Sequence, residues 1–305
     1  MEQRLLGASG PEIPVIMFGA WPIGGGLGGV DEPTAIATIH RALDLGITAI
    51  DTAEYYRTSE AIVGRALTGR PRDRVFLATK VSAGSFTRAR IREALENSLR
   101  ALQTDYVDLY QLHNYPTGVS LEEALAGLAE ARDSGKARYV GVSNFTVEQL
   151  AAARALGPVH SLQPRLSIFA SSAARDLLPF CQTHGIGVVG HSTLAKGLLT
   201  GKYRAGWAFA GDDERSRGGR FQGETFARFL AAADELAELA RAKGATLVQL
   251  AIAWVLSQPG VTSAIVGAKS PAQVEEHVGG VALRLTADEL GRIAAVAAKV
   301  PEATG

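Results

Sequence analysis

The sequence has 305 residues, of which 47% are hydrophobic and 20% are charged, and its 31 basic residues balance 31 acidic ones. This length allows one barrel-sized domain or two smaller ones. The balanced charge argues against a protein that binds nucleic acid or an anionic membrane, since both carry a basic surface. A single cysteine, Cys181, excludes an internal disulfide and a cage of cysteine metal ligands, and no metal site is predicted.

The start of the chain gives no sign of export. Residues 1–10, MEQRLLGASG, lack the basic and then apolar pattern of a signal peptide. No apolar run in the sequence is long enough to span a bilayer, and one thiol fits a reducing compartment. We therefore expect a cytoplasmic protein with no membrane or nucleic-acid partner.

Eight short apolar runs recur along the chain, each followed by a segment of helical period. They are too short for helices and rich in Val and Ile, which suits strands buried on both faces of a parallel sheet. Eight strand–helix repeats in about 250 residues predict a single-domain (β/α)₈ TIM barrel over residues 1–305. The runs cover residues 15–19, 46–50, 75–79, 106–112, 139–142, 159–162, 186–190 and 263–267.

Other segments predict how this barrel is closed and how its helices start. Residues 4–15 contain a Ser-Gly turn and predict an N-terminal hairpin that closes the barrel bottom. Segment 202–223 is glycine-rich, charged and aperiodic, so we expect a mobile loop. Helix caps are predicted at Asp31 and at the capping boxes SLEE (120–123), TVEQ (146–149), SPAQ (270–273) and TADE (286–289).

Polar or glycine residues follow seven successive runs, and in such a barrel those strand ends open on one face, where active sites lie. One polar residue after a strand can simply begin a loop or cap a helix. Seven strands that deliver such groups to one rim are better explained by a functional site. In chain order they are Asp51 and Tyr56, Lys80, His113 and Asn114, Ser143 and Asn144, Gln163, His191 and Ser192, and Gly267 and Lys269.

The first of these residues suggest proton transfer. A lysine in the barrel mouth needs a carboxylate to offset its desolvation, and Asp51 on the adjacent strand can pair with Lys80. A tyrosine near that ammonium is expected to have a pKa lowered from about 10 toward neutral pH. His113 can donate a hydrogen bond to the same oxygen or to a substrate carbonyl. The alternative is a structural Asp51–Lys80 salt bridge with a core histidine.

The second half of the rim offers amides, hydroxyls and glycines. Ser143, Asn144 and Gln163 suit the carboxamide of a nicotinamide. Lys269 lies beside a predicted helix start at Ser270, and a helix N-terminus next to a lysine is an anion site. Ser270 can also act only as the helix cap, and both roles are compatible.

Residues 24–29, GGGLGG, satisfy the G-x-G-x-x-G pattern of dinucleotide-binding folds, with Asp51 near the distance of a ribose-binding acid. However, five glycines in six residues fit almost any glycine pattern. The residues VDEP also separate them from the next helix. A dinucleotide-binding fold would leave the later rim residues unexplained, so the barrel is preferred.

The sequence resembles the aldo-keto reductases along essentially its whole length. No single motif is specific enough, but together they are highly specific. GITAIDTAEYY resembles the family segment that holds a catalytic aspartate and a proton-donating tyrosine. In this sequence the match places the aspartate at Asp51 and the tyrosine at Tyr56 rather than Tyr55. LATK and YQLHNYP resemble the segments of the catalytic Lys80 and His113. Further matches are GVSNF at the nicotinamide amide, LAKGLLTGKY at the pyrophosphate and GAKSPAQVEEH at the adenosine 2′-phosphate and adenine.

The resemblance implies an enzyme whose cofactor is NADP(H), with NADPH bound across the barrel mouth. It implies hydride transfer to an aldehyde or ketone while Tyr56 protonates the oxygen, or the reverse reaction on a sugar or alcohol. Trp21, Tyr55, Tyr56, His113 and Asn114 are expected to contact substrate, with Tyr115 nearby. The implied cofactor residues are Gly19, Ala20, Trp21, Asp51, Ser143, Asn144, Gln163, His191, Ser192, Thr193, Leu194, Gly197, Leu199, Gly267, Lys269, Gln273, Glu276 and His277.

The resemblance leaves one alternative of another class: a cofactor-sensing regulatory subunit with little turnover. The intact set of Asp51, Tyr56, Lys80 and His113 argues for an enzyme. The preference for NADPH depends chiefly on Lys269. Neither the substrate nor the oligomeric state can be predicted from the sequence.

The chain also departs from the family pattern. Where the family usually reads Y-S-P-L, this sequence reads HSTL, so His191 replaces a tyrosine that stacks on the nicotinamide and Thr193 replaces a proline. His191 can stack as a flat ring, but with less area. RTSE (57–60) is a shortened form of a glycine-containing stretch, and His277 stands at a common asparagine. We expect these changes to alter cofactor binding rather than chemistry.

Overall fold

The eight apolar runs form a closed barrel of parallel strands, as predicted. The computed structural model of the chain describes residues 1–82, 84, 86–211 and 213–303. Strands that follow one another along the chain pair in register, and the last pairs with the first. The barrel consists of β3 (Ile16–Gly19), β4 (Ala49–Asp51), β5 (Phe76–Val81), β6 (Val107–Leu112), β7 (Ala137–Ser143), β8 (Ser161–Gln163), β9 (Gly187–Gly190) and β10 (Val261–Gly267).

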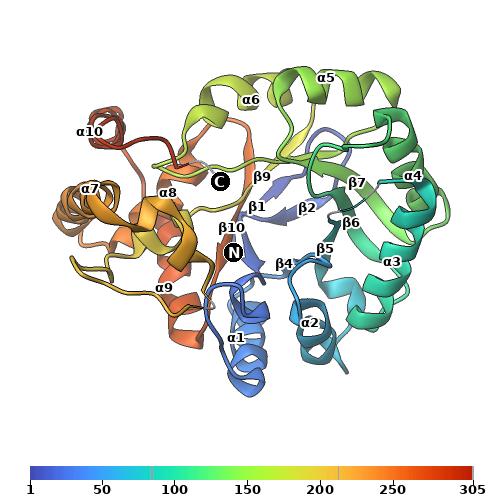
Figure 1. Cartoon of the computed structure of the whole chain (residues 1–305), viewed down its shortest axis with the longest axis horizontal. Coiled ribbons are helices and arrows are strands. Elements are labelled where there is room, and N and C mark those ends of the chain that lie inside the picture. The colour runs from blue at the N-terminus through green and yellow to red at the C-terminus, as the bar shows by residue number, and fades with distance from the viewer. Residues whose placement is uncertain (83, 85, 212, 304–305) are drawn as a thin grey trace.

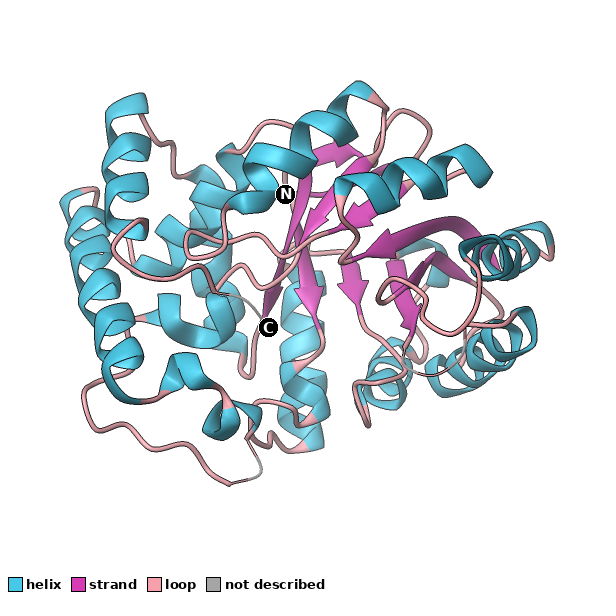
Figure 2. Cartoon of the chain, turned by 45° about the horizontal axis from the view of Figure 1, so that its top comes forward, coloured by secondary structure: helices cyan, strands magenta, loops and turns pink. Residues whose placement is uncertain are grey.

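Helices surround the barrel because their apolar faces pack against the outward-facing side chains of the strands, where most of the core lies. Figures 1 and 2 show them as an outer layer around the strands. Five short 3₁₀ helices lie in the connections: η1 (Pro22–Gly24), η2 (Arg72–Arg74), η3 (Ala195–Thr200), η4 (Glu214–Arg217) and η5 (Gly219–Phe221). The α-helices are α1 (Glu32–Asp44), α2 (Ser59–Leu67), α3 (Arg88–Leu102), α4 (Leu121–Asp133), α5 (Val147–Leu156), α6 (Ser172–Thr183), α7 (Gly223–Ala242), α8 (Leu247–Ser257), α9 (Pro271–Ala282) and α10 (Ala287–Ala297).

The predicted N-terminal hairpin is present and closes the amino end of the barrel. β1 (Gln3–Leu5) pairs antiparallel with β2 (Glu12–Pro14). Leu6 and Ile13 are fully buried and join the side chains that fill the barrel interior. Gly7 has φ +68°, and a Cβ there would lie 2.4 Å from the backbone oxygen of Gly185, two residues before β9. The turn therefore needs glycine to lie this close to the barrel.

Three predicted helix starts are confirmed. The Asp31 carboxylate accepts from the backbone N–H of Thr34 at 2.9 Å, so it caps α1. Thr146 and Thr286 each form a complete capping box at the start of α5 and α10. Such caps satisfy backbone donors that have no partner inside the helix.

Two predicted capping boxes are only half formed. Ser120 caps α4, but the carboxylate of Glu123 binds the backbone and guanidinium of Arg88 instead of closing the box. Ser270 caps α9, but the side-chain oxygen of Gln273 accepts from the N–H of the residue before Ser270. In both cases a competing donor within reach takes the oxygen that the box would use.

Segment 202–223, predicted as a mobile loop, contains two short 3₁₀ helices in its second half. These are η4 and η5, and Arg215 inside the segment is 7% exposed. Arg215 Nη2 lies 2.5 Å from Asp213 Oδ2 and donates to Leu27 O at 2.8 Å, while its Nη1 donates to Tyr203 Oη at 2.6 Å. A buried ion pair of this kind needs fixed partners, so the charged residues of this segment anchor it.

Among the described residues, no single helix is both long and apolar enough to cross a membrane. The pair α7 and α8, bent by 87°, reaches the required length and composition only when both helices are counted together.

Candidate active site

A lysine and a carboxylate meet where β4 and β5 end. The register sets Asp51 opposite Ala78, and Lys80 follows two residues later on the same face of β5. Lys80 Nζ donates to Asp51 Oδ1 at 2.7 Å and to Thr52 O at 2.8 Å. Lys80 is 0% exposed and Asp51 is 2% exposed. Burial lowers the pKa of Lys80, but Asp51 and Tyr56 outweigh it, so the pKa is raised and the side chain stays an ammonium.

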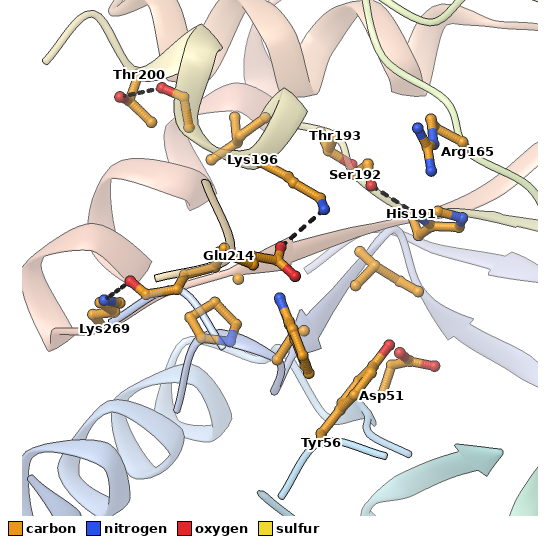
Figure 3. Close-up of a pocket in the computed structure, with 18 of the residues that line it drawn as sticks. Asp51, Tyr56, Arg165, His191, Ser192, Thr193, Lys196, Thr200, Glu214 and Lys269 are labelled. Atoms are coloured by element: carbon orange, nitrogen blue, oxygen red, sulfur yellow. Dashed lines mark hydrogen bonds and ion pairs between the residues drawn. The ribbon is translucent and has the colours of Figure 1, made fainter. Parts of the chain in front are cut away.

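Tyr56 completes this cluster from the loop after β4. Its Oη lies 3.5 Å from Lys80 Nζ, and that nitrogen lies 5.0 Å from the centre of the tyrosine ring. Figure 3 shows Tyr56 and Asp51 side by side beneath the cavity. The arrangement therefore holds a phenol hydroxyl next to a buried positive charge.

The predicted lowering of the Tyr56 pKa is wrong for the protein in this state. Burial raises the pKa of Tyr56, Lys80 lowers it and Asp51 raises it, and the net pKa is above the ordinary value. Desolvation of the phenolate thus exceeds the attraction of one ammonium that a carboxylate already neutralises. The phenol is protonated at neutral pH, which suits a proton donor.

His113 follows β6 and approaches Tyr56 with its edge, the ring centres lying 5.7 Å apart at 72°. Its Nδ1 lies 2.7 Å from Ser82 Oγ. Burial, and then the charge of Lys80, lower the pKa of His113 to about 3. The imidazole is therefore neutral at physiological pH, with one nitrogen a donor and the other an acceptor.

The amide and hydroxyl groups of the rim bind one another. Gln163 Nε2 donates to Asp51 Oδ2 at 2.9 Å, and Ser143 Oγ donates to Gln163 O at 2.8 Å. Asn144 Nδ2 donates to His113 O at 3.0 Å. The second oxygen of Asp51 is thus also occupied, and the carboxylate is fixed from two sides.

His191 makes two hydrogen bonds through its ring. Nδ1 lies 2.9 Å from Ser192 Oγ, and Nε2 lies 2.9 Å from Asn144 Oδ1. Burial and then Arg165 lower the pKa of His191 to about 3, so this ring is neutral too. These bonds fix the plane of the ring at the cavity wall and orient the amide of Asn144.

One cavity of about 670 Å³ joins these groups. Its wall near Tyr56 is aromatic, because Trp21 stacks on Tyr55 with ring centres 6.0 Å apart and lies 4.8 Å from Tyr56. The residues expected from sequence that line it are Gly19, Trp21, Asp51, Tyr55, Tyr56, His113, Asn114, Asn144, Gln163, His191, Ser192, Thr193, Leu194, Gly197, Gly267, Lys269, Gln273, Glu276 and His277.

Four expected site residues and one expected neighbour do not border the cavity. Ala20 and Leu199 are fully buried in the core. Lys80 and Ser143 are not in the cavity wall but contact residues that are: Lys80 bonds to Asp51 and Tyr56, and Ser143 to Gln163. The Tyr115 ring packs its edge against Phe145, with ring centres 5.2 Å apart. Direct contact with a ligand is therefore not the role of these side chains in this structure.

Sequence reasoning missed eleven residues that also line the cavity. Several are charged residues of segments 194–203 and 202–223, and although the first segment was expected at the pyrophosphate, these side chains were not singled out. Figure 3 shows Lys196 and Glu214 pointing toward each other, with Nζ and Oε1 2.9 Å apart. The eleven are Pro22, Leu27, Ser82, Arg165, Lys196, Thr200, Lys202, Glu214, Arg215, Val248 and Ile265.

Cations and amides share the cavity wall. Arg165, Lys196, Lys202, Arg215 and Lys269 line it together with the amide side chains of Asn144, Gln163 and Gln273. Lys269 Nζ donates to Leu27 O at 2.5 Å and Gly28 O at 2.8 Å. A wall with both kinds of donor suits a ligand with phosphates and a carboxamide, as a nicotinamide dinucleotide has.

The sequence matches the model of the Aldo/keto reductase family over residues 15–298. The chain belongs to the aldo/keto reductase family.

Curated and solved relatives agree with this assignment. The aldo-keto reductase YhdN of Bacillus subtilis (strain 168) is 42% identical over 289 residues, which cover 90% of this chain and 87% of that protein. The solved structure of a glycerol dehydrogenase from Gluconobacter oxydans superposes with a TM-score of 0.87 at 35% identity, covering 97% and 95% of the two chains. The holo form of an aldo-keto reductase from Bacillus halodurans gives 0.81 at 29% identity, covering 99% and 98%.

Membership of this family makes the protein an oxidoreductase. Aldo/keto reductases act on small-molecule carbonyl compounds and the corresponding alcohols, and generally use NAD(P)H. The reductase barrel described above has its cavity at the carboxyl ends of the strands, where barrel enzymes place their active sites.

Proposed function

We propose that this aldo/keto reductase uses NADPH to reduce an aldehyde or ketone, or to oxidise the corresponding sugar or alcohol. The observation that carries the proposal is the fully buried Lys80, paired with Asp51 and 3.5 Å from the hydroxyl of Tyr56 on the cavity wall. A structural salt bridge needs no tyrosine at an open cavity. A proton donor for a carbonyl needs both.

The roles of the four residues follow from their contacts. In reduction, Tyr56 Oη gives its proton to the carbonyl oxygen, and the ammonium of Lys80 stabilises the phenolate left behind. Asp51 and Thr52 O hold that ammonium in place. His113 donates a hydrogen bond to the same carbonyl oxygen. The nicotinamide cofactor, when bound, supplies the hydride or accepts it in the reverse reaction.

Turnover itself is the direct test. The purified protein is mixed with NADPH and a panel of aromatic aldehydes, aliphatic aldehydes, sugars and small ketones, and the loss of NADPH absorbance is followed. The reverse direction uses NADP⁺ with the alcohols. Steady-state turnover supports the enzyme, whereas NADPH binding without turnover on any member of the panel supports a cofactor-sensing subunit.

Removing the charge of Lys269 is expected to weaken NADPH binding and leave NADH binding nearly unchanged. A cation that meets a 2′-phosphate contributes about 1.5–3 kcal/mol through a charged hydrogen bond. We therefore expect Lys269→Met to raise the KM for NADPH by about tenfold or more and the KM for NADH by less than threefold. Lys299→Met is the matched control, because Lys299 pairs with Glu235 and neither residue lines the cavity. Equal losses for both cofactors would remove Lys269 from phosphate recognition.

Replacing His191 by tyrosine is expected to tighten NADPH binding. The larger ring offers more stacking area, which is worth about 0.5–1.5 kcal/mol, or a two- to twelvefold lower Kd. Quenching of tryptophan fluorescence reports binding, because Trp21 lines the cavity. His184→Tyr is the control, since His184 packs on Phe180 at 4.1 Å outside the cavity. An unchanged Kd in His191→Tyr would mean that the departure at this position does not affect cofactor binding.

A further inference from the structure

One hydroxyl contacts the imidazole of His113 at its Nδ1. The strand register explains this contact, since β5 and β6 pair Lys80 with Gln111 and Val81 with Leu112. The next residues along the two strands are Ser82 and His113. Ser82 Oγ lies 2.7 Å from His113 Nδ1, and Ser82 is 5% exposed.

Ser82 is itself held from the outer side of the barrel. Its backbone N–H donates to Glu54 Oε1 at 2.6 Å. The other oxygen of Glu54 accepts from Arg90 Nη2 of α3 at 2.7 Å. A helix, a loop and a strand end thus fix the position of this serine, and a fixed serine can fix the ring that it touches.

The direction of the Ser82–His113 bond follows from counting donors. A neutral imidazole has one N–H and one acceptor nitrogen, and a hydroxyl has one proton to donate. Within the described part of the chain, Ser82 Oγ has no hydrogen-bond partner except His113 Nδ1. If Nδ1 carried the proton, the hydroxyl proton would have no acceptor among the described residues, and a 5% exposed hydroxyl without an acceptor is costly. The hydroxyl therefore donates to Nδ1, and the ring proton is on Nε2.

We propose that Ser82 is a positioning residue that holds His113 in the tautomer whose Nε2–H donates to the carbonyl oxygen of the substrate. Nε2 makes no hydrogen bond to any described residue of the chain, so it is available for a ligand. The other tautomer would turn an acceptor lone pair toward the carbonyl oxygen, and two acceptors repel. This inference rests on the proposed role of His113 in carbonyl reduction.

The tautomer can be measured without turnover. Long-range ¹H–¹⁵N spectra of protein with ¹⁵N-labelled histidine distinguish Nε2–H from Nδ1–H, and the loss of one signal set in His113→Asn assigns His113 among the six histidines. We expect the Nε2–H form in the wild type and a population of the Nδ1–H form in Ser82→Ala. Ser82→Thr keeps the hydroxyl and should restore the Nε2–H form. An Nδ1–H signal assigned to His113 in the wild type would overturn the proposal.

Kinetics complete the test, using the fastest aldehyde of the panel. We expect Ser82→Ala to lower kcat by about tenfold with the KM for NADPH unchanged within twofold, and Ser82→Thr to regain kcat within about threefold. Ser167→Ala is the matched control, because Ser167 is 1% exposed and its buried hydroxyl makes no hydrogen bond within the described residues. A folded Ser82→Ala protein with unchanged tautomer and unchanged kcat would refute the role of Ser82. Retained activity in Tyr56→Phe would refute the proposed mechanism instead, and would leave the tautomer result standing.

Discussion

Tyr56→Phe is expected to lower kcat for carbonyl reduction by about 10²–10⁴-fold, the usual contribution of a positioned general acid. The change removes only the hydroxyl that lies 3.5 Å from Lys80 Nζ and keeps the ring that packs against Trp21. NADPH affinity should therefore stay within about twofold, which fluorescence titration measures separately from turnover. A lower kcat with unchanged NADPH affinity would assign the effect of the hydroxyl to the chemical step.

Tyr106→Phe is the control for this experiment. Its ring lies between the guanidinium groups of Arg72 and Arg138, each 4.2 Å from the ring centre, and it does not line the cavity. Loss of that hydroxyl should leave kcat unchanged. If Tyr56→Phe reduced aldehydes as fast as the wild type, Tyr56 would not be the proton donor.

The same residue predicts opposite pH profiles for the two directions of the reaction. Burial raises the pKa of Tyr56 above its ordinary value, although Lys80 opposes this. The phenol needed for reduction is thus present through neutral pH and is lost only above about pH 10. Oxidation needs the phenolate, so its rate should rise with pH into the alkaline range. Titration of His113 should add no inflection to either pH–rate profile near neutral pH, since its pKa is lowered to about 3.

The strand ends of this barrel could be predicted because burial on both faces leaves a continuous apolar run. The predicted strand bounds are wrong where the apolar run and the strand do not coincide. Run 46–50 begins three residues before β4, because Gly46 at φ +83° and Ile47 still belong to the turn after α1. β7 begins two residues before run 139–142, since Ala137 pairs with Val107 of β6 and the charged Arg138 continues the strand.

The candidate site likewise contains residues that could be predicted from the sequence and residues that could not. Asp51, Tyr56, Lys80 and His113 could be named from sequence because each lies in the last residues of a strand or in the loop that follows, at the carboxyl edge where the fold brings them together. Arg215 could not, since its partners Asp213, Tyr203 and Leu27 lie up to 188 residues away in the chain and no periodicity relates them. The contact of Ser82 with His113 was also missed, because it depends on the register of two strands rather than on either strand alone.

The pKa of Tyr56 shows a further limit of sequence reasoning. The sequence gives the identity of the charged neighbours, and these alone predict a lowered value. The sign of the net shift depends on how much water reaches the phenol and on how far Asp51 cancels the charge of Lys80. Both are properties of the packed site.

Breaking the buried ion pair is expected to have the largest effect on stability. Lys80→Met leaves the Asp51 carboxylate with Gln163 as its remaining side-chain partner, and an uncompensated buried charge costs about 3–5 kcal/mol of the free energy of unfolding. Lys80→Met/Asp51→Asn removes both charges, so it should lose less than Lys80→Met alone. Urea unfolding of the two single variants, the double variant and the wild type gives the coupling free energy. Equal stability of Lys80→Met and the wild type would contradict a buried charged pair.

The dependence of the free energy of unfolding on alkaline pH tests the Lys80–Asp51 pair a second time. Burial lowers the pKa of Lys80, but Asp51 and Tyr56 raise it by more, so its net pKa lies above the ordinary value. The folded protein therefore holds this proton more tightly than the unfolded chain does. The stabilisation is fully present below the unfolded pKa of about 10.4 and is lost as pH rises through the higher folded pKa. The free energy of unfolding should therefore fall less steeply above about pH 10 in the doubly neutral variant than in the wild type. Among the described residues Lys80 is the only fully buried ammonium, and its raised pKa keeps it charged through neutral pH beside the hydroxyl of Tyr56.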